Sequence, residues 1–261
     1  YIYKGTTSQF YDPQARRFLP DRYVEGACPH CAYEKARGDQ CDNCGRTLDP
    51  DQLINPRSKL TGATPEARDT EHFFLKLSAF QEPLLAWLRS REGWRKHVLN
   101  FSIGFVEEGL HDRAITRDLE WGVTLPVEDL GPGKRIYVWF AAVSGYLSAS
   151  KEWAKLRGEP DAWKKWWEDP AARGYYFIGK DNIPFHTIVW PAILMGYDGL
   201  NLPFDVPANQ YVTFKGEKAS KSEGVGDPVL SYLERYQPDA IRYGLAANLP
   251  ETSDTDLTEA E

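Results

Sequence analysis

The sequence predicts an α/β protein that carries a small metal-binding module near its start. Three observations support this prediction. Between residues 134 and 214, apolar strand-like runs alternate with helical segments, the order typical of parallel βαβ units. Two paired cysteine motifs precede this region, and a short lysine-rich segment follows it. The length of 261 residues is enough for one large domain or two modest ones.

Individual elements follow from the spacing of apolar residues. Steps of three and four predict helices across residues 68–110, and an apolar run of β type predicts a strand at 134–142. Further predicted helices are 144–158, 161–169, 186–196, 228–236 and 238–249, and further predicted strands are 175–179 and 204–214. Residues 1–62 are rich in turn residues and contain all four cysteines.

Composition excludes several classes of protein. Hydrophobic residues make up 42% of the chain and charged residues 26%, so the chain can bury a core. A net charge of −7 argues against binding to nucleic acid through bulk positive charge. No apolar run has the length of a membrane span and no signal peptide opens the chain, so we expect a cytoplasmic protein without membrane contact. The chain begins at Tyr1 rather than at a methionine, and its last residues carry no obvious terminus signal. We therefore expect it to be a piece of a longer protein.

The cysteines form two CxxC pairs, Cys28–Cys31 and Cys41–Cys44, separated by nine residues. Each pair can turn both thiolates toward one tetrahedral ion, and two pairs complete its ligand shell. The alternatives are two disulfides or a redox-active pair, but disulfides are rare in cytosolic proteins and a redox motif does not usually occur twice. The spacing therefore favours a structural zinc ion held by all four cysteines, with His30 outside the ligand set.

Lys218 and Lys221 lie on a glycine-flanked loop that follows a predicted strand. Two ammonium groups on one short loop can neutralise the charge that develops on a departing pyrophosphate. An ordinary solvated lysine turn is the alternative, because short motifs have a high false-positive rate. The surrounding sequence decides between the two.

Longer segments resemble the methionyl-tRNA synthetases, which are class I aminoacyl-tRNA synthetases. The loop KASKS (218–222) is similar to the KMSKS motif, and YFIGKDNIPFHTIVWPA (176–192) is similar to a segment with FIGKD, a Phe-His pair and a Trp-Pro pair. Other segments that fit are LTGATPEARDTEHFF (60–74), TRD (116–118), YVWFAAVSGYLSA (137–149) and PDAIRYGLAANLPETSDTDL (238–257). The similarity keeps the order of the motifs from end to end.

This resemblance implies the second half of a class I Rossmann-type catalytic domain, with a zinc-knuckle connective insertion and a stem-contact region. Residues 1–136 would be the connective region, with the knuckle at about 24–52; residues 137–211 would be the second half of the core, and 212–261 the KMSKS-type loop and stem-contact region. The first half, which carries the HIGH motif, and the anticodon-binding domain would lie outside this chain. We therefore expect the chain alone to be inactive.

The resemblance also implies roles for particular residues in a methionine–tRNA ligase that uses ATP, with Mg²⁺, to charge tRNA(Met). Gly179 and Asp181 should approach the adenosine, and Lys218 and Lys221 should act on the phosphates, with Lys221 the stronger candidate. The residues expected to bind methionine are Arg117, Trp139, Ala142, Val143, Tyr146, Phe185 and His186. An aromatic pocket suits the soft thioether sulfur, although each aromatic residue could instead belong to the core.

Three positions depart from the family pattern: Ala141 replaces an acidic residue, Ser144 an isoleucine, and Ala219 the methionine of KMSKS. These three departures are compatible with an alternative, a non-catalytic paralogue that binds tRNA or a protein partner. A second alternative is a class I synthetase for another apolar amino acid. The sequence does not predict the oligomeric state.

Overall fold

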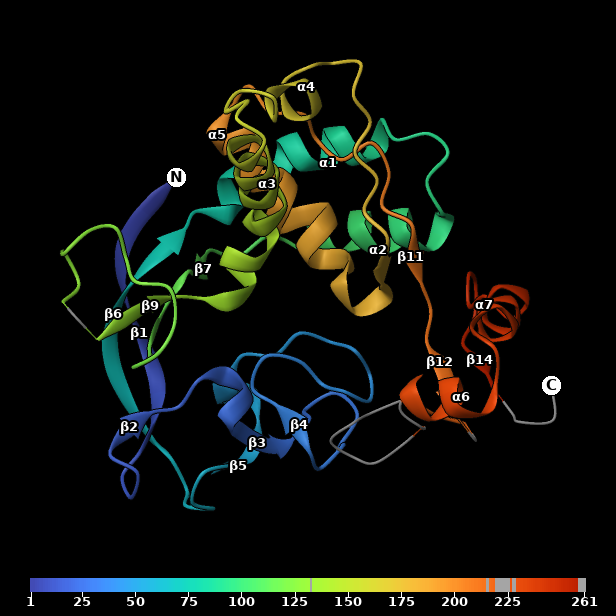
Figure 1. Ribbon diagram of the computed structural model, residues 1–261. Coiled ribbons are helices and arrows are strands. Elements are labelled where there is room, and N and C mark those ends of the chain that lie inside the picture. The colour runs from blue at the N-terminus through green and yellow to red at the C-terminus, as the bar shows by residue number, and fades with distance from the viewer. Residues whose placement is uncertain (132, 215, 219–225, 227–228, 258–261) are drawn as a thin grey trace. The chain divides into compact units, whose positions relative to one another are not determined.

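The computed structural model describes residues 1–257 except 132, 215, 219–225 and 227–228. The chain divides into two compact units. Unit 1 comprises Tyr1–Phe80 and Leu110–Ala149, and unit 2 comprises Gln81–Gly109 and Ser150–Glu261. Figure 1 shows the helices and strands of the chain, coloured by residue number.

Unit 1 is built on a long antiparallel ribbon of β1 (Ile2–Asp12) and β6 (Glu66–Leu75), in a sheet of order β2-β1-β6-β7. Ten residue pairs join the two strands, from Ile2 opposite Leu75 to Tyr11 opposite Glu66. The helix predicted across residues 68–110 is therefore wrong for its first part. Pairing with a strand far away in the sequence overrides the local helical spacing of the apolar residues there. The shorter strands of unit 1 are β2 (Arg17–Phe18), β7 (Arg113–Ala114), β8 (Thr116–Asp118) and β9 (Lys134–Ile136), with the single turn η3 (Leu77–Phe80).

A second sheet in unit 1 supports the cysteine motifs. It has the order β4-β3-β5, with β3 at Val24–Ala27, β4 at Ala36–Arg37 and β5 at Ile54–Ser58, and it is flanked by η1 (Asp21–Tyr23) and η2 (Pro50–Gln52). Its core is small and includes two of the cysteines. The buried members are Leu19, Val24, Cys28, Ala36, Cys41, Leu48 and Leu53.

The helix α3 (Val138–Leu156) begins earlier than the sequence predicts. The strand expected at 134–142 ends at Ile136, and the amides of Phe140 and Ala141 already bond to the carbonyl of Tyr137. The aromatic and β-branched residues of this run thus lie in the first turns of a helix. Local β propensity is weak compared with tertiary context, which decides here.

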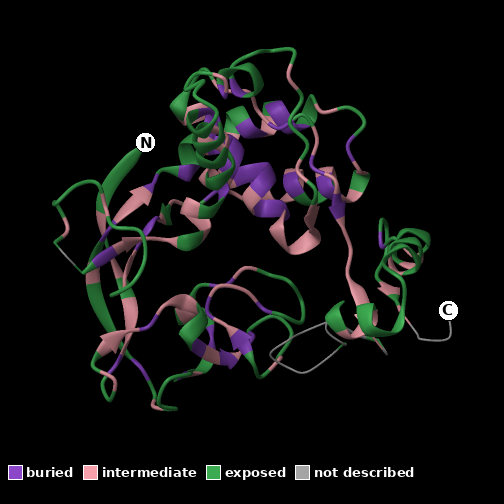
Figure 2. Ribbon diagram, viewed as in Figure 1, coloured by how far each residue is buried: buried purple, intermediate pink, exposed green. Residues whose placement is uncertain are grey.

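The first part of unit 2 is mainly helical and contains a parallel strand pair. Its buried positions gather on the helices (Figure 2), and β10 (Ile178–Gly179) pairs in parallel with β11 (Ala208–Asn209). The helical elements are α1 (Gln81–Arg89), α2 (Lys96–Glu107), α4 (Lys164–Trp167), η4 (Lys180–Asn182), the π-helical turn η5 (Phe185–Val189) and α5 (Trp190–Tyr197). The parallel pair and its helices confirm the predicted α/β class. No helix among the described residues is long and apolar enough to cross a membrane.

The last part of unit 2 contains a three-stranded sheet of order β13-β12-β14. The strand β12 (Val212–Phe214) turns back antiparallel into β13 (Glu217–Lys218), and β14 (Thr255–Asp256) lies parallel to β12 on its other side. Two helices, α6 (Val229–Arg235) and α7 (Pro238–Ala247), connect them. Both helices were predicted from the sequence and are confirmed.

Candidate functional site

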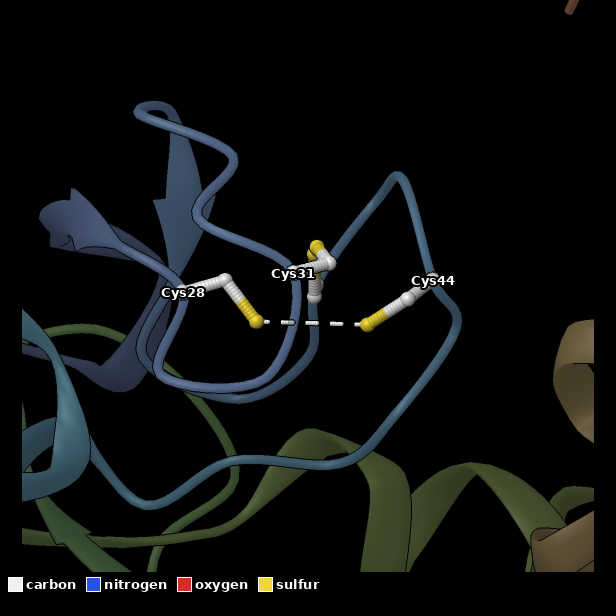
Figure 3. Close-up of side chains that lie close together, drawn as sticks. Cys28, Cys31 and Cys44 are labelled. Atoms are coloured by element: carbon white, nitrogen blue, oxygen red, sulfur yellow. Dashed lines mark hydrogen bonds between the residues drawn. The ribbon is translucent and has the colours of Figure 1, made fainter.

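The four cysteines converge in unit 1. All their sulfur atoms lie within 4.8 Å of one another. Cys28 Sγ lies 3.9 Å from Cys44 Sγ (Figure 3). Cys31 Sγ lies 3.6 Å from Cys41 Sγ. A tetrahedral ion with metal–sulfur bonds of about 2.3 Å requires sulfur–sulfur edges of about 3.8 Å, so the cluster fits a metal ion. All four thiols are free, which excludes the disulfide alternative here.

The two CxxC segments have the same backbone conformation. In each, the amide of the first cysteine bonds to a carbonyl five residues later, and the residue after the second cysteine bonds back to the first. The bonds are Cys28 N to Tyr33 O (2.9 Å), Ala32 N to Cys28 O (2.9 Å), Cys41 N to Arg46 O (2.9 Å) and Gly45 N to Cys41 O (2.8 Å). Ala32 and Gly45 both adopt the left-handed region, with φ of 58° and 72°. Each turn thereby aims two thiols at one point.

The thiols of Cys31 and Cys41 in this cluster have different pKa values. A hydrogen bond from the Asn43 side chain, together with one from the Tyr33 backbone, lowers the pKa of Cys31 to about 6. Burial raises the pKa of Cys41 to about 12. A cation bound by all four sulfurs would stabilise both as thiolates, because metal binding displaces thiol protons. His30 lies beside Arg46, its Nδ1 at 3.4 Å from the guanidinium, and stays outside the cluster as predicted.

Four of the predicted methionine-binding residues share one face of α3. Trp139, Ala142, Val143 and Tyr146 follow the spacing i, i+3, i+4, i+7, which aligns side chains along a helix. Val143 is only 3% exposed, whereas Tyr146 is 42% exposed. At 100° per residue, Ala141 and Ser144 point to the opposite face. Two of the three departures from the family pattern therefore lie away from the predicted methionine-binding face.

Arg117, the fifth predicted methionine-binding residue, makes its described contacts within unit 1. Its guanidinium bonds to Asp21 Oδ2 at 2.9 Å and to the carbonyls of Ala114 and Thr116, at 2.7 and 2.8 Å. It also lies 4.0 Å from the ring centroid of Tyr137. The side chain is thus held firmly next to the start of α3.

Phe185 and His186 occupy the π-helical turn η5 in unit 2. The π conformation is rare and is frequently found at functional sites. His186 is buried, and its Nδ1 lies 2.9 Å from the carbonyl oxygen of Asn182, so Nδ1 carries the proton. Burial lowers the pKa of His186, which keeps the ring neutral at pH 7. Trp190, 1% exposed and packed against Trp167, belongs to the core.

Gly179 and Asp181 lie at the carboxyl end of β10, in unit 2. A Cβ at position 179 would lie 2.9 Å from Asp181 Oδ1, so only glycine leaves this carboxylate its position. Ligands of open α/β sheets bind at the carboxyl ends of parallel strands. Lys180, which lies between these two residues in the sequence, forms an ion pair with Asp254, with Nζ 2.7 Å from Oδ1.

Of the two predicted phosphate-binding lysines, Lys218 lies on β13 opposite Thr213 of β12. Lys221 and Ala219 lie outside the described residues. The structure thus gives the backbone register of one lysine.

Comparison with known proteins shows to which family the chain belongs. The family model described as tRNA synthetases class I (M) matches residues 1–261. The chain belongs to this family. Methionine–tRNA ligases of Dehalococcoides mccartyi strain CBDB1 and Thermoplasma acidophilum are 59% and 53% identical to it over 261 residues, which are 100% of the chain and 47% and 48% of the relatives. Mycobacterium tuberculosis methionyl-tRNA synthetase in complex with methionyl-adenylate matches with a TM-score of 0.66 at 26% identity, over 99% of this chain and 44% of that one.

This class I synthetase chain spans about half the length of the curated relatives that it matches. The family resemblance predicted from its motifs is thereby confirmed.

Two aspartates of this synthetase chain could not be identified as functional residues from the sequence. Asp254 and Asp256 hold the strand that leads to Lys218, but no spacing or composition signal distinguishes them from other acidic residues near the C-terminal end.

Proposed function

We propose that the protein containing this chain is a methionine–tRNA ligase. The observation that carries the proposal is identity of 53–59% to methionine–tRNA ligases along the whole chain. In the first step, a methionine carboxylate oxygen attacks the α-phosphorus of ATP and pyrophosphate leaves. In the second step, a terminal ribose hydroxyl of tRNA(Met) attacks the activated carbonyl and AMP leaves.

The metal in the cysteine cluster is zinc in this proposal. Four thiolates at tetrahedral spacing match the ligand set of structural zinc sites. Four protein ligands leave no open coordination position, so the ion would hold the two CxxC turns together and would take no part in the reaction. The proposed location is the cytoplasm, where thiols stay reduced.

Methionine would be bound by the α3 face described above, by Phe185 and His186 of η5, and by Arg117. The support from α3 is the alignment of its four residues. The support from η5 is the neutral imidazole of His186, whose ring centroid lies 5.8 Å from that of Tyr176. A thioether makes favourable contacts with aromatic rings, with its sulfur about 5 Å from the ring. Arg117 would act near the methionine carboxylate through the charge that it holds beside Tyr137.

ATP would lie with its ribose at Asp181 and its phosphates toward Lys218 and Lys221, with Mg²⁺ on the phosphate oxygens. The support is the place of Gly179 and Asp181 at the end of a parallel strand. The lysines would stabilise the negative charge that grows as pyrophosphate leaves. In this assignment, residues 1–136, 137–211 and 212–261 retain the domain roles that the resemblance implies.

The test is methionine-dependent ATP–pyrophosphate exchange by the full-length protein, followed by charging of tRNA(Met). We expect exchange with methionine and at least about 100-fold less with isoleucine, valine or leucine, because a pocket matched to one side chain discriminates by this order. The 261-residue chain alone should give no exchange. Absence of exchange by the full-length protein, with tRNA binding retained, would instead support the non-catalytic alternative.

A further inference from the structure

Asp256 holds the turn through which the chain reaches Lys218. Its Oδ1 accepts one hydrogen bond from the amide of Gly216 and one from Thr213 Oγ1, both at 2.8 Å. These two donors lower the pKa of Asp256, so it is a carboxylate at neutral pH. Parallel pairing of β14 with β12 brings Asp256 opposite Thr213. One carboxylate therefore fixes both the strand and the turn.

The geometry of the turn explains why this contact matters. Gly216 has a φ of +79°, a conformation that glycine adopts readily and other residues rarely do. The turn places Lys218 opposite Thr213, in the antiparallel register of β12 and β13. Further along, a Cβ at Gly226 would lie 2.9 Å from the ring of Phe214, so the chain comes back against the same strand. Both flanks of the KASKS segment thus rest on β12.

A second aspartate ties this hairpin to the predicted adenosine segment. Asp254 Oδ1 accepts hydrogen bonds from the amide of Tyr211, at 2.8 Å, and from Lys180 Nζ, at 2.7 Å. The Lys180 ammonium also lies 4.1 Å from the ring centroid of Tyr211. Because Lys180 lies between Gly179 and Asp181 in the sequence, Asp254 and the strand β14 that follows it link the two parts of the proposed ATP site.

We propose that Asp256 is a positioning residue for the phosphate-binding lysines, acting through the Gly216 turn, and that Asp254 sets this turn relative to the adenosine segment. This inference rests on the proposed function. Asp254 and Asp256 are both exposed, so they contribute little to the hydrophobic core. Their substitution should therefore affect catalysis more than folding. Displacement of a reacting group by about 1 Å can cost about 100-fold in rate.

The experiment uses full-length protein carrying Asp256→Ala, with ATP–pyrophosphate exchange as the assay. We expect kcat to fall about ten- to a hundredfold, with the KM for methionine and the Tm nearly unchanged. Asp256→Asn, which retains an acceptor oxygen, should recover most of the activity. Asp239→Ala is the matched control, because Asp239 is an exposed aspartate on α7 whose ion pair is with Arg242.

Coupling to Lys218 separates positioning from a general structural role. If Asp256 acts through this lysine, adding Asp256→Ala to Lys218→Ala should slow exchange by less than about twofold, because residues that act as a unit are not additive. Unchanged kcat in Asp256→Ala would overturn the inference, and so would losses that multiply when Asp256→Ala is combined with Lys218→Ala and, separately, with Lys221→Ala.

Limited trypsin digestion tests the same inference without relying on activity. Loss of the Asp256 carboxylate should speed cleavage after Lys218 at least about fivefold relative to Asp239→Ala, because exposed backbone that opens more often is cut faster. Equal cleavage rates would contradict a role of Asp256 in holding the turn. Absence of exchange by the parent protein would instead contradict the proposed function and leave this readout valid.

Discussion

The cysteine cluster and the lysine-bearing hairpin both rest on short strands, but their supports come from different distances in the sequence. All four cysteine sulfurs, and the backbone hydrogen bonds that orient them, lie between residues 28 and 46. The hairpin that carries Lys218 is instead held by Asp256, which arrives only after two intervening helices. The first site is fixed by contiguous sequence and the second by tertiary contacts.

This difference decides what kind of perturbation each site tolerates. The cysteine module is a small sheet whose buried core contains Cys28 and Cys41 themselves. Loss of the proposed zinc ion should therefore unfold the module. In the hairpin, residues 212–214 are only half-buried and Gly216 is exposed, so substitutions that affect it should change rates while the fold persists.

The largest effect is expected for Cys41→Ser. Structural zinc contributes about 10–16 kcal/mol to the folding of small metal-binding modules, and Cys41 is the proposed ligand that is fully buried, with 0% exposure. The zinc content should fall from one ion per chain to a small fraction of that value. The backbone amides of residues 24–58 should exchange their hydrogens rapidly. His30→Ala, next to the cluster and outside it, should keep its zinc. A full equivalent of zinc in Cys41→Ser would contradict the four-cysteine ligand set.

Prediction from the sequence succeeded where determinants are contiguous. The CxxC spacing predicted the cluster, and apolar periodicity predicted α6 and α7. It failed for β6, where the strand is selected by ten pairs with β1, and for the start of α3, where aromatic residues of β type form helical turns. Neither outcome can be deduced from a local window, because the partners lie elsewhere in the chain.

The candidate ATP and methionine residues came from resemblance, since no spacing pattern links segments so far apart. Once the helix is known, however, the i, i+3, i+4, i+7 spacing from Trp139 to Tyr146 can be seen in the sequence. The strand predicted at 134–142 hid this alignment. Asp254 and Asp256 lie in a segment, 238–257, that resembles the family, but nothing in this segment distinguished them before the tertiary contacts were known.

Lys221→Ala should cause the next largest effect, and we expect it to slow the reaction without unfolding the protein. A charge that engages as pyrophosphate departs lowers the activation barrier, so its loss should reduce kcat by about two to three orders of magnitude with little change in the KM for ATP. Exchange kinetics of the full-length variant measure both constants. Lys155→Ala, an exposed lysine on α3, is the control. Unchanged kcat in Lys221→Ala would remove the lysine from the reaction.

A buried ion cluster in unit 1 offers a test of stability. Asp118 contacts Lys134 Nζ at 2.8 Å, His72 Nε2 at 3.3 Å and Thr70 Oγ1 at 2.8 Å. Burial alone would raise the pKa of Asp118, but these contacts outweigh it and lower the pKa to about 2. A carboxyl shifted from about 3.9 to about 2 contributes about 2–3 kcal/mol to stability at pH 7.

The direction of the pKa shift of Asp118 determines how its contribution to stability depends on pH. Because the folded-state pKa is lowered, the stabilisation is present above pH about 4 and is lost as the pH falls toward about 2. Urea unfolding of the parent and of Asp118→Asn should therefore differ by a gap that narrows across this interval. Asp69→Asn, an exposed neighbour on β6, should keep the parent's pH dependence. A gap that stays constant from pH 7 to pH 2 would contradict the lowered pKa.

The smallest effect is expected for His186→Ala, which tests whether η5 faces methionine. Loss of one contact in an apolar pocket should lower kcat/KM for methionine about ten- to a hundredfold, and should weaken discrimination against isoleucine. Since burial lowers the pKa of His186, the neutral ring should act unchanged from pH 8 down through about 6.5, its ordinary pKa, and lose its contribution only below that. Full-length protein assayed across this range, beside Lys155→Ala, gives the comparison. Equal kcat/KM for methionine in both variants would assign His186 to the core of unit 2, where its Nδ1 already bonds to Asn182, and would leave methionine recognition to α3.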